Sequence, residues 1–195
     1  RYRFVRSFKN RFGNIHEVGV FAMTERGLQE VSNPSAIFLS DRKQDISGRV
    51  VLITQEGTRP LLVEVQALLD KTSLVNPRRL CVGLDSQRLS MLLAVLNRHC
   101  RVSLGGYDIF VNVVGGIRVM DSGSDVAVGA AILSSFLNKD IPQDTACFGE
   151  VGLGGEIRPV QRGEERLKEA AKLGFKQALI PQGNKISKEI QGLEI

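Results

Sequence analysis

The sequence predicts a single α/β domain whose central sheet contains both parallel and antiparallel strands. Three features carry this prediction: a strand–turn–strand hairpin over residues 48–67, a strand over 109–114 leading into a small-residue helix over 124–136, and a strand over 177–180 that follows another helix. A hairpin pairs its strands antiparallel, whereas strands joined through a helix pair in parallel. A chain of 195 residues can bury one such core.

The chain opens with a basic arm, residues 1–13. Five of the 26 Lys and Arg residues lie there without an acid, so the remainder balances the 21 Asp and Glu residues and the net charge of +5 belongs to the arm. Aromatic and basic residues alternate along it, which is typical of an edge strand. Positive arms commonly contact phosphate, either in nucleic acid or in a nucleotide. We expect an arm over residues 1–15 and a globular domain over residues 16–195.

The middle of the chain has clear local signals. Residues 49–54 and 61–67 are predicted strands around a turn at 56–58, because the second run alternates its side chains between two faces. Asp85 is expected to cap a helix that ends near His99. Its leucines recur at the i, i+3, i+4, i+7 spacing of a core-facing stripe. These leucines are Leu89, Leu92, Leu93 and Leu96.

The last third alternates between strands and helices. We expect a strand over 145–149, a strand pair over 151–160 and a helix over 164–173 ended by Gly174. A strand over 177–180 stops at Pro181, and residues 184–191 are expected to begin a final helix. The start of the helix over 124–136 can be capped by Ser124 or Asp121.

Several classes of protein are excluded by composition. Cys81, Cys100 and Cys147 are scattered without a CxxC pair, which argues against a disulfide framework or a zinc site and favours buried free thiols. The histidines, His16 and His99, are too few for a metal site, so no metal is expected. No run is long enough to span a membrane, and no targeting segment opens the chain.

The motifs KNRFG (residues 9–13), EVSNPSAIFL, GTRPLLVEVQAL, NVVGGIRV and FGEVGLGGEIRPV occur in this order. Together they resemble the RadA (Sms) family of DNA repair proteins, specifically its C-terminal Lon-protease-like domain with the KNRFG motif ahead of it. The similarity covers essentially the whole chain. It implies a Lon-protease-like fold for this chain. It also implies a longer protein with two further domains, a zinc finger that binds Zn and a RecA-like ATPase that binds ATP and Mg. This chain has no P-loop, so it is expected to be the part behind that motor.

The Lon resemblance implies a serine–lysine dyad, in which an unprotonated lysine activates a serine hydroxyl. Ser124 falls at the nucleophile position, but Glu164 falls at the lysine position. Arg162 and Arg166 flank Glu164 and should lower its pKa, while Asp125 adds a negative charge where an oxyanion would form. We therefore predict a protease fold without protease chemistry, with Ser124 as a helix N-cap. A residual serine peptidase using Ser124 is the alternative.

The resemblance also implies a function. The domain is expected to oligomerise and bind DNA without proteolysis. The whole protein is expected to be a DNA-dependent ATPase that catalyses branch migration in homologous recombination and DNA repair. Expected partners are single-stranded or branched DNA, further copies in a hexamer, and a RecA-type recombinase, in the bacterial cytoplasm or a eukaryotic organelle. The alternative is a purely structural hexamerisation scaffold. Phosphate contacts need basic side chains in turns or at strand ends. The candidates are Arg59, Arg78, Arg79 and Arg118.

The KNRFG motif has a separate expected role. Lys9 and Arg11 lie two residues apart and would share one face of a strand, with Asn10 and Phe12 on the other and Gly13 at the turn. The motif resembles the segment that hexameric helicases send to a neighbouring subunit's nucleotide. On that resemblance, Lys9 and Arg11 act in trans on ATP in the adjacent ATPase domain, stabilising charge on the γ-phosphate.

Overall fold

The structure is a computed structural model that describes residues 2–6, 9, 11, 18–31, 35, 39 and 46–195. The expected turn at Asn33-Pro34 and the expected boundary between residues 15 and 16 lie outside the described residues. Among the described residues, no helix is long and apolar enough to cross a bilayer.

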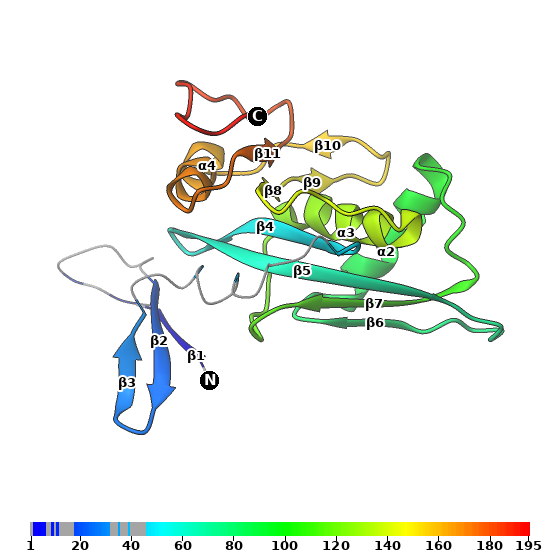
Figure 1. Ribbon diagram of the computed structural model, residues 1–195, viewed down its shortest axis with the longest axis horizontal. Helices are drawn as coiled ribbons and strands as arrows, with labels where there is room; N and C mark the ends of the chain where they lie inside the picture. The colour runs from blue at the N-terminus through cyan, green and yellow to red at the C-terminus, as the bar shows by residue number, and fades with distance from the viewer. Residues whose placement is uncertain are drawn as a thin grey trace.

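A six-stranded mixed sheet forms the centre of the molecule, in the order β11-β8-β4-β5-β7-β6 (Figure 1). The strands are β4 (Arg49–Glu56), β5 (Arg59–Lys71), β6 (Arg79–Val82), β7 (Tyr107–Val113), β8 (Thr145–Cys147) and β11 (Gln177–Leu179). β4, β5 and β7 pair antiparallel, whereas β6–β7, β4–β8 and β8–β11 pair in parallel. The predicted mixed α/β sheet and its central hairpin are confirmed.

Helices cover both faces of this sheet. α2 (Ser86–His99) and α3 (Asp125–Leu137) pack on one face, where Val63 and Val65 join the leucine stripe of α2 in one core cluster. α4 (Gly163–Lys172) packs on the other face, where Leu62 belongs to a second cluster. Successive residues of β5 enter opposite clusters because strand side chains alternate, so β5 is buried on both sides. Small residues in α3 allow close approach: Ala127 and Ala131 are fully buried.

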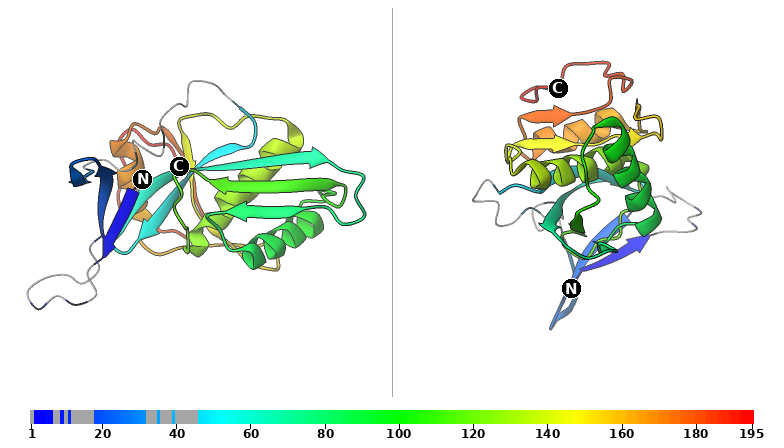
Figure 2. Two further views of the ribbon diagram at one scale, coloured as in Figure 1. Left: turned by 90° about the horizontal axis from the view of Figure 1, so that it is seen from below. Right: turned by 90° about the vertical axis from the view of Figure 1, so that its right-hand side faces the viewer.

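A second, three-stranded antiparallel sheet stands at one end of the six-stranded sheet (Figures 1 and 2). It contains β1 (Tyr2–Arg6), β2 (Val18–Thr24) and β3 (Gly27–Glu30). The basic arm thus contributes a strand, β1, as its alternating pattern predicts, and β1 pairs with β2 in register from Tyr2 to Arg6.

The remaining elements surround the start of α3. The short helix η1 (Ser122–Ser124) precedes it, and β9 (Glu150–Val151) pairs with β10 (Ile157–Arg158) in a small hairpin. The predicted final helix over residues 184–191 is wrong, because this segment folds into turns and bends. Its polar groups bond to other segments instead: the Asn184 amide donates to Val160 O at 2.8 Å, and Ser187 N–H donates to Glu164 at 2.6 Å.

Candidate functional site

Asp121 organises the turn that carries Ser124. Its Oδ1 accepts a hydrogen bond from Gly123 N at 3.0 Å, so Asp121 caps η1 and not the helix over 124–136, for which a cap by Ser124 or Asp121 was expected. Its Oδ2 accepts from Gln55 N at 3.2 Å and from Arg166 Nη1 at 2.6 Å. The turn is therefore attached to β4 and to α4, and the position of Ser124 is set by tertiary contacts.

Ser124 is buried and lines a cleft. It stands at the N-cap position of α3, yet its side chain makes no capping hydrogen bond. The residue is 5% exposed, and its Oγ has no hydrogen-bond partner among the described residues. The cleft has a volume of about 290 Å³ and is lined by Arg88, Met91 and Met120, among others. No lysine is among the described residues that line it, whereas a dyad needs an amine base beside the serine.

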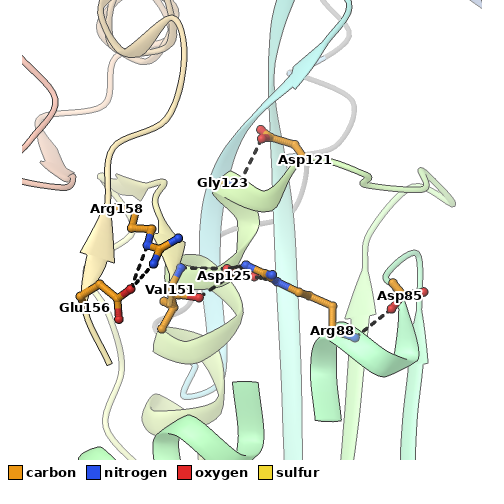
Figure 3. Close-up of polar contacts among 8 residues, drawn as sticks. All are labelled: Asp85, Arg88, Asp121, Gly123, Asp125, Val151, Glu156 and Arg158. Atoms are coloured by element: carbon orange, nitrogen blue, oxygen red, sulfur yellow. Dashed lines mark hydrogen bonds and ion pairs between the residues drawn. The ribbon is translucent and has the colours of Figure 1, made fainter. Parts of the chain in front are cut away.

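Asp125 is held in place by an arginine that sequence reasoning missed. Arg88 Nε donates to Asp125 Oδ1 at 2.9 Å and Nη2 donates to Oδ2, while Val151 N donates to Oδ2 at 2.8 Å (Figure 3). The hydrogen bond with Asp125 is the main reason that the pKa of Arg88 is raised. The two residues are 37 positions apart, so no local pattern could have paired them. Arg88 joins α2, α3 and β9, and it offsets the negative charge next to Ser124.

Glu164, at the expected lysine position, is engaged elsewhere. Its Oε1 accepts from Ser187 N at 2.6 Å, and its Oε2 lies 3.9 Å from Lys168 Nζ. The pKa of Glu164 is lowered, as expected, but the causes are the hydrogen bonds with Ser187 and the charges of Lys168 and Lys188 rather than Arg162 and Arg166. It lines a surface depression with Ser187 and Lys188 and is absent from the lining of the Ser124 cleft. A carboxylate so placed cannot serve Ser124 as a base.

The four candidate DNA arginines differ in how they are used. Arg78 Nε donates to Asp108 Oδ2 at 2.8 Å and its backbone N–H to Oδ1 at 2.7 Å; these bonds lower the pKa of Asp108. Arg79 donates to the carbonyl oxygens of Tyr107 and Leu104. Arg59 begins β5, opposite Glu56 in the hairpin register.

Arg118 is the candidate best placed to contact a ligand. It lies between β7 and η1, it is exposed, and no side-chain partner is found for it among the described residues. Arg78 and Arg79 instead stabilise the chain's own fold.

The structure describes part of the KNRFG motif. Lys9 and Arg11 are exposed, whereas Asn10, Phe12 and Gly13 lie outside the described residues. The expected action of Lys9 and Arg11 on a neighbour's nucleotide stays a prediction.

The cysteines are free thiols in three different settings. Cys147 is buried, Cys81 is half-buried and Cys100 is exposed, so the expectation of buried thiols is wrong for Cys100. Within the described residues, no group of three or more His, Cys, Asp or Glu side chains could hold a metal ion.

Comparison with known proteins gives matches over the whole chain. The family model described as subunit ChlI of Mg-chelatase matches residues 85–184, from the cap of α2 to just beyond β11. The DNA repair protein RadA of Haemophilus influenzae is 55% identical over all 195 residues, that of Pseudomonas aeruginosa 54%, and that of Escherichia coli 54%. The chain spans 42–43% of the length of these relatives.

Proposed function

The chain belongs to the family described as subunit ChlI of Mg-chelatase and, over its whole length, to the RadA group of DNA repair proteins, and we propose that it is a non-proteolytic DNA-binding and assembly domain. It would serve a longer DNA repair protein, because the relatives extend well beyond the matched part. The assignment of these relatives as DNA repair proteins supports a role in DNA repair. The finer assignment, DNA contact and assembly during branch migration, is inferred from the chain's own residues.

The observation that carries the non-proteolytic part of this proposal is the isolation of the Ser124 hydroxyl. A serine at its ordinary pKa is a weak nucleophile and needs an adjacent base. Ser124 Oγ has no hydrogen-bond partner in the described part of the chain. Glu164, the residue at the lysine position, is bonded to Ser187. A residual peptidase would therefore lack its base, and we favour a binding role for the domain.

Basic charge supports the DNA-binding part. The chain carries a net charge of +5, and residues 1–13 hold five basic residues without an acid. Lys9, Arg11 and Arg118 are exposed. Phosphate contacts of this kind give affinity without sequence preference, because they do not reach the edges of the bases. We expect single-stranded or branched DNA to bind in this way.

Assembly and ATP use would involve the rest of the longer protein. ATP and Mg would be held by an ATPase domain and Zn by a zinc finger, with Lys9 and Arg11 reaching the nucleotide of a neighbouring subunit in a hexamer. Charge from a guanidinium and an ammonium stabilises the γ-phosphate during transfer. A RecA-type recombinase is the expected partner. In the alternative, a purely structural scaffold, the domain would form the hexamer but would not contact DNA.

A salt titration of DNA binding tests the proposal. The 195-residue chain is mixed with dye-labelled single-stranded DNA of two unrelated sequences, and fluorescence anisotropy is recorded across salt concentrations. We expect equal affinity for both sequences and a linear fall of log K with log salt, with a slope of about −0.7 for each phosphate contacted. No binding at low salt, or binding that salt leaves unchanged, would refute the DNA-binding role and favour the scaffold.

A further inference from the structure

Three adjoining depressions surround the turn that carries Ser124, and together we name them the Ser124 groove. Their volumes are about 560, 290 and 360 Å³. Met120, Asp121 and Ser122 line both the first and the second depression. Arg88, Met91, Leu92 and Asp125 line both the second and the third. The surface is therefore continuous and has room for a ligand longer than one side chain.

Two polar side chains of the groove have an oxygen without a hydrogen-bond partner among the described residues. Ser124 is 5% exposed, and its hydroxyl makes no hydrogen bond within the described residues. Gln55 lines the first depression; its Nε2 donates to Gly57 O at 3.1 Å, but its Oε1 is buried and accepts no hydrogen bond from any described residue. The Ser124 hydroxyl lines the cleft and is open to a hydrogen bond from a ligand, whereas the buried Gln55 Oε1 cannot be reached from the groove surface. A hydroxyl can donate and accept, so Ser124 can pair with either an N–H or a C=O group of a ligand.

The formal charge of the groove favours a basic ligand. Six carboxylates and four guanidiniums line it, a formal charge of −2 in a chain of net charge +5. Asp85 forms no ion pair with a described residue, and Glu150 acts on the charge of Arg88 from beyond ion-pair distance. Such a surface repels phosphate and attracts a cation, so it differs in sign from the DNA-binding surface proposed above.

Apolar side chains stand exposed around the groove. Met120 is 73% exposed, Met91 42% and Leu153 71%. Methionine side chains are flexible and polarisable, which suits binding to varied apolar side chains. Exposed apolar groups gathered at a polar cleft typically mark a site of interaction with another protein.

From these observations we propose that the Ser124 groove binds, without cleaving it, an extended peptide segment of a partner protein that carries both apolar and basic side chains. The apolar side chains of the segment pack on Met91, Met120 and Leu153. Its basic side chains approach Asp85 and Glu150, and one of its backbone groups forms a hydrogen bond with Ser124 Oγ. The partner stays intact because Ser124 has no base beside it.

The test uses two dye-labelled peptides with blocked ends, one of alternating leucine and lysine and one of alternating leucine and glutamate. Binding to the 195-residue chain is followed by fluorescence anisotropy without DNA. The overall charge of the chain favours the glutamate peptide, so tighter binding of the lysine peptide reports the groove itself. We expect Glu150→Gln to weaken lysine-peptide binding roughly two- to fivefold and Met120→Lys to weaken it further. Asp140→Asn, a matched change at an exposed acid outside the groove, should leave binding unchanged.

Three outcomes would overturn the proposal. One is that the lysine peptide binds no more tightly than the glutamate peptide, or that both groove variants bind like the unmodified chain. Another is that single-stranded DNA displaces the peptide from the groove in competition. The third is that Met120→Lys changes the mass of the particle in solution, which would make the groove an interface between copies. Failure here leaves the salt titration of DNA binding unaffected, so the two proposals fail independently.

Discussion

Arg166 Nη1 lies 2.6 Å from Asp121 Oδ2, so a cation from α4 holds the turn in which Ser124 lies. The side chain of Arg166 is 2% exposed. The same Nη1 donates to Ile53 O at 2.6 Å, and the guanidinium carbon lies 5.4 Å from the centre of the Phe148 ring. Arg166 thus connects α4, β4 and the candidate site.

Removal of this ion pair should destabilise the fold strongly. Arg166→Ala leaves Asp121 without its cation and leaves Ile53 O without that donor, which should lower the free energy of unfolding by about 3–5 kcal/mol. Urea denaturation measures the change. Arg158→Ala is the matched control, because Arg158 pairs with Glu156 on the surface and should contribute little. Equal effects of the two variants would contradict a structural role for Arg166.

The Asp108–Arg78 contact should make stability depend on acid pH. Hydrogen bonds from the Arg78 backbone and guanidinium lower the pKa of Asp108, so the folded state binds its proton less readily than the unfolded state. The stabilisation is complete above the unfolded pKa of about 3.9 and is lost as pH falls through the lower folded pKa. We expect Asp108→Asn to reduce the urea midpoint at about pH 6, and the difference from the unmodified chain to shrink below about pH 4. A difference that stays constant with pH would contradict this linkage.

The thiols should react in the order of their exposure. Burial raises the pKa of Cys147 to about 12, and burial, followed by the charge of Asp85, raises the pKa of Cys81. Only the thiolate reacts, so an aromatic disulfide reagent should modify the exposed Cys100 first and Cys147 only after unfolding. Released chromophore, measured with and without guanidinium chloride, counts the reactive thiols, and Cys100→Ser should remove the fast phase. Rapid reaction of all three in the folded chain would contradict the burial of Cys147.

Two arginines should differ in their effect on DNA binding. Arg118→Ala removes an exposed cation without a side-chain partner among the described residues, so it should weaken DNA binding and reduce the salt slope without changing stability. Arg79→Ala removes donors to Tyr107 O and Leu104 O, so it should lower the urea midpoint. If Arg118→Ala binds DNA like the unmodified chain, Arg118 is not a phosphate contact.

Local patterns predicted most of the secondary structure. The leucine stripe after Asp85 becomes the buried face of α2, and the hairpin over residues 48–67 becomes β4 and β5. These elements depend on periodicity and capping, which lie within a few residues along the chain. The final helix failed because Asn184 and Ser187 are bonded to Val160 and Glu164, and such tertiary contacts override a weak local helix propensity.

The candidate site was predicted less completely. Ser124 and Asp121 were identified from the turn residues around them, but their partners Arg88 and Arg166 come from other helices. Such pairs cannot be predicted from local patterns, because the sequence around a helical arginine does not reveal whether its side chain contacts water or a buried carboxylate. The orphaned Gln55 Oε1 is likewise visible only when the neighbouring segments are in place.

Labelling with a fluorophosphonate tests the central claim most directly, because the reagent attaches only to an activated serine hydroxyl. Intact mass is recorded for the unmodified chain and for Ser124→Ala after incubation with the reagent, beside an active serine peptidase as a positive control. We expect no mass increase in either form of the chain, since no described residue forms a hydrogen bond with Ser124 Oγ as a base would. A mass increase of one label in the unmodified chain that disappears in Ser124→Ala would contradict the account.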